Sequence, residues 1–145
     1  MKKSIEELRT NLVEVALEWQ STFGVSPSIT SALSELDSAL LVGCKSEQYI
    51  ECMKDRTAVS KGYDFIFNGK KYQVKANRPS GKKGSKVTLV PRAKNYDWDY
   101  LVWILYDVSY NIEEAWLWNV NEYKKCFSDV NRLSPADMRK GEKLK

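Results

Sequence analysis

Three polar residues on either side of a predicted tight turn have side chains that could do chemistry together: Asp64, Gln73 and Lys75. The dipeptide Asn68-Gly69 lies between them and favours a two-residue type I′ hairpin turn. With this turn, Asp64 pairs with Gln73, and the alternation of side chains along a strand places Asp64, Gln73 and Lys75 on one face. The opposite face of the hairpin is apolar and is predicted to pack in the core, through Phe65, Phe67, Tyr72 and Val74.

This combination of a carboxylate, an amide and an ammonium group suits metal-assisted hydrolysis. Mg²⁺ accepts carboxylate oxygens together with amide or backbone carbonyl oxygens, such as the carbonyl of Val74. A bound Mg²⁺ ion stabilises charge on a phosphate and lowers the pKa of water, and the amino group of Lys75 can orient that water or help to deprotonate it. The residues therefore predict phosphoester hydrolysis that requires no histidine.

The composition of the chain excludes several other chemistries. The 145 residues contain no histidine, so Ser-His-Asp hydrolysis, Cys-His proteolysis and histidine-ligated zinc all lack an essential group. The three cysteines, Cys44, Cys52 and Cys126, form no C-x-x-C motif and are interpreted as reduced thiols. No apolar run reaches the roughly 20 residues of a membrane span, and acids stand where a signal peptide would be apolar. We therefore expect a cytoplasmic (intracellular) protein with no membrane partner.

Basic residues are concentrated around the predicted hairpin. Residues 65–96 contain nine lysines and arginines and no acid, whereas the rest of the chain has 14 bases and 19 acids. A local charge of +9 on an otherwise negative chain indicates a surface that attracts polyanions. Charge alone leaves two alternatives open, namely a solvated lysine-rich hairpin and a surface for an acidic protein partner.

The order of these motifs, an acid and then Gln73-Val74-Lys75 after a glutamate-bearing helix, resembles the PD-(D/E)XK nuclease superfamily over about residues 30 to 108. Two positions depart from the family pattern, because Gln73 stands where an acid is usual and Tyr63 stands where proline is usual. The resemblance implies a restriction-endonuclease-like fold and a DNA endonuclease that uses Mg²⁺ or Mn²⁺ and leaves 5′-phosphate ends. Cutting both strands then requires two sites, so a homodimer is expected. Because glutamine carries no charge, this site should bind metal more weakly unless another acid contributes.

Glu35 is the preferred candidate for that additional acid, and with Asp64 and the Val74 carbonyl it completes the predicted metal ligands. The periodicity of a helix places Glu35 with Ala32, Leu36, Ala39 and Val42 rather than with the neighbouring serines. A carboxylate on such an apolar arc is costly to bury unless it is paired or bound to metal. Glu35 can also be an acid at the edge of the core or a partner of Lys75, and the rival candidates are Asp37, Glu47 and Glu51.

The segment 77–86 follows Lys75 directly and is rich in glycine, lysine and arginine. Glycines allow a close backbone approach, and basic side chains suit phosphate contacts. We therefore expect DNA contacts from Arg78, Lys82, Lys83, Lys86 and Arg92. A flexible solvated loop is the alternative for this segment. The alternative function is a non-catalytic nucleic-acid-binding protein on the same fold, which Gln73 favours.

The order of the apolar segments predicts an α/β (α+β) domain of helices and mostly antiparallel strands. The resemblance implies a restriction-endonuclease-like core, with a central mixed sheet of about five strands, an antiparallel hairpin and flanking helices. We divide the single expected domain, 1–145, into a helical part (1–56), a sheet core (57–120) and a C-terminal helix and tail (121–145). Helices are predicted over 4–22, from 28 or 30 to 42, 46–54 and 121–127. Strands are predicted over 63–68, 70–76, 85–93, 99–108 and 113–120.

Overall fold

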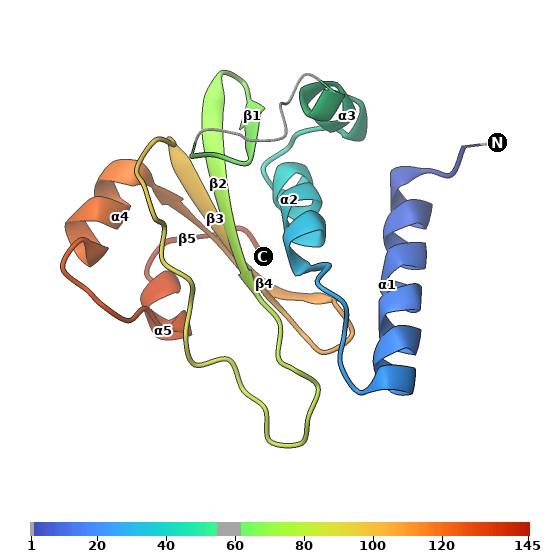
Figure 1. Ribbon diagram of the computed structural model, residues 1–145. Coiled ribbons are helices and arrows are strands. Elements are labelled where there is room, and N and C mark those ends of the chain that lie inside the picture. Colours follow the sequence, from blue (N-terminus) through green and yellow to red (C-terminus); the bar gives the residue numbers. More distant parts are fainter. Residues whose placement is uncertain (1, 55–61) are drawn as a thin grey trace.

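The computed structural model describes residues 2–54 and 62–145, which form helices on both faces of a sheet (Figure 1). The helices are α1 Ile5–Phe23, α2 Thr30–Leu41, α3 Ser46–Lys54, α4 Val120–Phe127 and α5 Pro135–Met138. The strands are β1 Phe65–Phe67, β2 Lys70–Asn77, β3 Tyr100–Tyr106, β4 Ile112–Asn119 and β5 Glu142–Lys143. Within the described ranges, none of the helices has both the length and the apolar character that crossing a bilayer requires.

The five strands form one mixed sheet in the order β1-β2-β3-β4-β5. The pair β2–β3 is parallel, and every other neighbouring pair is antiparallel. A parallel pair needs a crossover connection, and residues 78–99 provide it. The structure thus confirms the predicted α/β class, the mixed five-stranded sheet and the flanking helices.

The hairpin β1–β2 has the predicted register. Phe67 pairs with Lys70 and Phe65 with Tyr72, so Asn68 and Gly69 form the turn. Both turn residues have positive φ angles, 51° and 73°, as a type I′ turn requires. Phe65, Tyr72 and Val74 are buried, which confirms the predicted apolar face.

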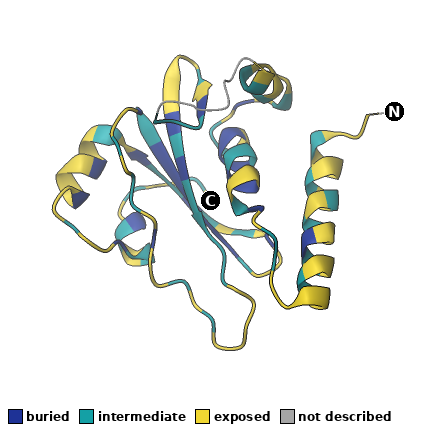
Figure 2. Cartoon of the chain, viewed as in Figure 1, coloured by how far each residue is buried: buried dark blue, intermediate teal, exposed yellow. Residues whose placement is uncertain are grey.

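The central strand β3 explains why both faces of the sheet are covered. Its residues alternate between two hydrophobic clusters, with Val102, Ile104 and Tyr106 in one cluster and Leu101, Trp103 and Leu105 in the other. Residues of α1 and α2 complete the first cluster, and residues of α4, α5 and the 78–99 crossover complete the second, so much of the central sheet is buried in Figure 2. Full burial of one large apolar side chain stabilises the fold by about 2–3 kcal/mol, so β3 is the main anchor of the sheet.

One predicted strand, 85–93, is wrong. In the described structure this segment forms only a single bridge, between Val90 and Leu133, and otherwise passes over one face of the sheet. Val87, Val90 and Ala93 of this segment pack into the second hydrophobic cluster, so the segment covers that face of the sheet. The fifth strand is instead β5, which pairs with Trp116 and Leu117 of β4.

Candidate functional site

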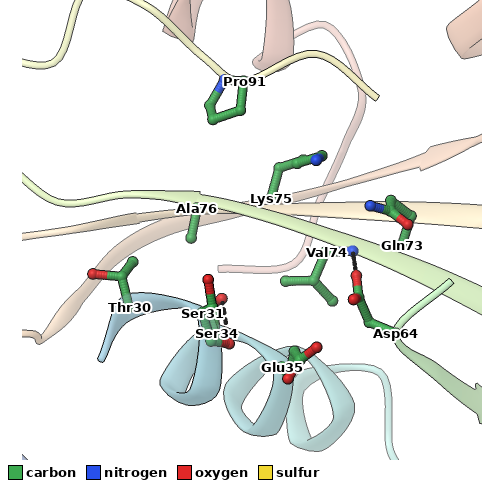
Figure 3. Close-up of a pocket in the computed structure, with 10 residues that line it drawn as sticks. All are labelled: Thr30, Ser31, Ser34, Glu35, Asp64, Gln73, Val74, Lys75, Ala76 and Pro91. Carbon is green, nitrogen blue, oxygen red and sulfur yellow. Dashed lines mark hydrogen bonds between the residues drawn. The ribbon is translucent and has the colours of Figure 1, made fainter. Parts of the chain in front are cut away.

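A pocket of about 280 Å³ lies beside β2, beyond the end of β1 (Figure 3). It is lined by side chains of α2, the start of the hairpin, β2 and the crossover. The lining residues are Thr30, Ser31, Ser34, Glu35, Asp64, Gln73, Val74, Lys75, Ala76 and Pro91. The structure therefore brings together every residue that the sequence proposed for catalysis or metal binding.

Asp64 is held in place by the backbone of β2. Its N–H donates to the carbonyl of Tyr72 at 2.8 Å, and its Oδ2 accepts a hydrogen bond from the N–H of Val74 at 2.7 Å. The backbone groups of Tyr72 and Val74 therefore face the same edge of β2, because they are two residues apart in a strand. The carbonyl of Val74 consequently points toward the edge on which the Asp64 carboxylate lies.

Gln73 and Lys75 lie on the side of β2 that faces away from α2, as Figure 3 shows, and both are half-buried. Their neighbours on β3 are Leu101 and Trp103. Asp64 does not share their face as predicted, since its carboxylate is turned to the backbone of Val74. The carboxylate lies at the edge of the strand, whereas the amide and the ammonium group lie on one of its faces, and all three line the same pocket.

Burial beside β3 affects the acid–base properties of Lys75. Desolvation lowers the pKa of the Lys75 ammonium below the ordinary lysine value, because the charged form loses contact with water. The negative charge of Asp64 opposes this lowering, and the positive charge of Lys94 adds to it. Lys75 therefore gives up a proton more readily than an exposed lysine does.

The two acids of α2 have different environments. Glu35 is half-buried and lines the pocket, on the opposite side of β2 from Lys75 (Figure 3). The carboxylate of Asp37 is buried and accepts hydrogen bonds from Nε and Nη2 of Arg9, at 2.8 and 2.7 Å, and from the hydroxyl of Tyr106 at 2.5 Å. Asp37 is thus a structural residue that fixes α1 to α2. The remaining rivals, Glu47 and Glu51, are exposed on α3 and do not line the pocket.

The helical periodicity placed Glu35 apart from the neighbouring serines of α2, and this prediction is wrong. Ser31 and Ser34 line the pocket with Glu35, and the Ser34 hydroxyl donates to the carbonyl of Ser31 at 3.1 Å. Residues three and four apart on a helix are neighbours, so the spacing of Ser31, Ser34 and Glu35 is the sequence signal that identifies this face. Ala32, which the helical periodicity placed with Glu35, is exposed.

The predicted DNA-binding residues fall into two groups. Lys82, Lys83 and Lys86 are exposed in the crossover. The guanidinium of Arg78 instead contacts the protein itself, donating to Gln20 Oε1 at 2.7 Å and to the carbonyl of Val108, and it lies 4.3 Å from the ring centroid of Tyr110. Arg92 likewise donates to the carbonyl of Phe127 at 3.1 Å. DNA contacts by all five residues remain a prediction.

Comparisons of this chain with protein-family models and with curated proteins find no match. Over residues 2–54 and 62–145, no group of three or more aspartate, glutamate and cysteine side chains is arranged to hold a metal ion. The pocket offers a different set of donors, in which two carboxylates are accompanied by an amide oxygen and a backbone carbonyl. All of these are hard oxygen donors, which fit Mg²⁺ or Mn²⁺ better than soft metals.

Proposed function

We propose that the chain is a Mg²⁺-dependent DNA endonuclease that hydrolyses phosphodiester bonds and leaves 5′-phosphate ends. The observation that carries this proposal is the pocket beside β2, which gathers Glu35, Asp64, Val74 and Lys75. The exposed lysines of the crossover support DNA as the substrate, because phosphate contacts from basic side chains dominate binding to nucleic acids. We further infer that α2, the hairpin β1–β2 and β3 form the core of a restriction-endonuclease-like fold.

In this proposal Asp64, Glu35, the Val74 carbonyl and the Gln73 amide oxygen hold the metal. Mg²⁺ or Mn²⁺, when bound, supplies stabilisation of charge on the scissile phosphate and acidifies water. Lys75 positions the attacking water through its N–H donors, next to the phosphate. The water oxygen adds to phosphorus, the bond from phosphorus to the 3′ oxygen breaks, the proton of the water passes to solvent and the 3′ oxygen takes up a proton.

Plasmid cleavage tests the proposal directly. Supercoiled DNA is incubated with the protein and about 5 mM Mg²⁺, a level chosen to saturate a weak oxygen site. We expect nicking or linearisation that falls by about 100-fold or more in Asp64→Asn and in Lys75→Met, the scale of a lost catalytic group. Cleavage that persists in both variants would assign the activity to another site.

Two matched control variants distinguish the loss of a catalytic side chain from the loss of a side chain that only stabilises strand β2. The carboxylate of Asp99 accepts the N–H of Lys71 at 2.8 Å, as that of Asp64 accepts the N–H of Val74 at 2.7 Å. Asp99→Asn therefore removes the charge from a similar backbone contact of β2 outside the pocket and should leave cleavage intact. Lys71→Met is the corresponding control for Lys75→Met, because Lys71 is an exposed lysine of the same strand.

A non-catalytic nucleic-acid-binding protein is the second candidate, and the neutral side chain of Gln73 in the pocket favours it. In that case the wild-type protein binds DNA with a steep salt dependence and cleaves it with neither Mg²⁺ nor Mn²⁺. The variant Gln73→Glu restores a third carboxylate beside Asp64 and Glu35. Cleavage by Gln73→Glu but not by the wild type would establish that the wild-type protein binds DNA without cleaving it, and that Gln73 is the residue responsible for the missing activity.

A further inference from the structure

Helix α1 carries an exposed apolar stripe. Leu8, Leu12, Val15 and Trp19 lie on one face of this helix, with Phe23 at its end, and the exposed fractions of these side chains range from 39% for Leu12 to 63% for Phe23. In Figure 2, α1 stands at the edge of the molecule with most of its surface exposed or intermediate. We refer to these five residues as the α1 stripe.

The domain uses a different face of α1 for its own packing. Ala16 is the buried residue of the helix, and Val13 and Leu17 pack partly against the core. Arg9 is paired with Asp37, and Gln20 donates to the carbonyl of Ser80 at 2.9 Å. These contacts fix the rotation of α1, so the α1 stripe is turned outward.

The size of the stripe is appropriate for a protein interface. From their exposed fractions, these five residues present roughly 500 Å² of mostly apolar surface to solvent, which is comparable to the largest apolar patch on a typical monomer, about 300–600 Å². A standard interface buries about 800 Å² on each partner, so the stripe and the polar residues around it are sufficient for one.

We propose that the α1 stripe is the interface of a homodimer in which the two copies of α1 pack antiparallel. The spacing of Leu8, Leu12, Val15 and Trp19 is four, three and four residues, which reads the same in both directions. A two-fold axis between Leu12 and Val15 therefore places Leu8 of each copy against Trp19 of its partner, and Leu12 against Val15. This self-complementarity is what an isologous contact requires.

The oligomeric state of the full chain tests this proposal independently of any nuclease activity. Sedimentation velocity between about 1 and 100 µM should show a dimer, the range in which interfaces of this size commonly associate. The variant Val15→Asp should raise the dissociation constant by about 100-fold or more, because each interface contains two copies of this residue. Leu89→Asp is the matched control, since Leu89 is exposed to a similar degree, 47%, but lies in the crossover.

The double variant Leu12→Lys/Val15→Glu tests the orientation. In the antiparallel register these two positions face each other across the two-fold axis, so the double variant should dimerise more tightly than Leu12→Lys alone, whereas a parallel arrangement would place like charges together. Unchanged circular dichroism of Val15→Asp establishes that the variant is folded. A wild-type protein that is monomeric at about 100 µM, a dimer that Val15→Asp leaves intact, or a double variant that dimerises no better than Leu12→Lys would each overturn the proposal.

Discussion

Replacing Asp37 with asparagine should destabilise the fold strongly, although Asp37 is only two residues from Glu35. The side chain of Asp37 is 6% exposed and is the meeting point of Arg9, on α1, and Tyr106, on β3. The substitution keeps the shape of the side chain but removes its charge. The charge of Arg9 is then left without its counter-ion.

The expected size of the effect comes from the burial of the pair. Removing one member of a buried ion pair costs about 3–5 kcal/mol, because the remaining charge is uncompensated. The side chain of Arg9 is 24% exposed, and its Nη2 also donates to the carbonyl of Tyr110 at 3.0 Å. Water and this carbonyl therefore compensate part of the loss, and we expect about 3 kcal/mol, the lower end of the range.

Urea denaturation measures this difference. With a slope of about 2 kcal/mol per molar, the midpoint of unfolding should fall by about 1.5 M in Asp37→Asn. The control is Glu51→Gln, which breaks the exposed pair with Lys54 and should change stability by less than about 0.5 kcal/mol. If the midpoint of Asp37→Asn falls by less than about 0.5 M, the buried pair does not hold α1 in place and the reasoning is refuted.

Two further predictions concern alkaline pH and the crossover lysines. Burial, and secondarily the charge of Asp37, raise the pKa of the Tyr106 hydroxyl in the folded protein. In the unfolded chain this hydroxyl ionises with a pKa of about 10, so Tyr106 stabilises the fold fully below that pH. Above it, the free energy of unfolding should fall by about 1.4 kcal/mol per pH unit, because only the unfolded chain loses the proton. Urea midpoints at pH values above 10 should therefore fall less steeply in Tyr106→Phe than in the wild type, and equal slopes would contradict this assignment. Substituting Lys82, Lys83 and Lys86 with glutamine should reduce the slope of log affinity for DNA against log salt by about 2–3, as expected for three lost phosphate contacts. Lys125→Gln on α4 should leave that slope unchanged, and an unchanged slope in the triple variant would remove the crossover from the DNA interface.

The parts of the fold that depend on local sequence were predictable. The Asn68-Gly69 turn set the register of the hairpin, because both residues tolerate positive φ angles, and the hairpin in turn placed Asp64, Gln73 and Lys75 in one pocket. The segment 85–93 was not predictable in this way. Its side chains suit a strand, but strand pairing depends on which sheet edges are free, and that is decided by residues far along the chain.

The choice between Glu35 and Asp37 was also beyond local reasoning. Both acids lie on the same helix, and only the distant partners Arg9 and Tyr106 identify Asp37 as the structural one. Similarly, β5 consists of a glutamate and a lysine, a polar pair whose sequence carries no strand signal. Its position is set by the edge of β4, which offers pairing partners at Trp116 and Leu117.

The orientation of α1 illustrates a conflict between two signals. Its apolar stripe would normally face the core, whereas the ion pair of Arg9 with Asp37 requires an adjacent face to point inward. Leaving the buried carboxylate of Asp37 without Arg9 would lower the free energy of unfolding by several kcal/mol. The exposed stripe, in contrast, can still be buried in an interface with another chain. The ion pair therefore decides the rotation of the helix. If two copies of the α1 stripe pack together, the apolar pattern correctly predicts that these residues are buried. What the pattern does not predict is that the surface covering them belongs to a second chain.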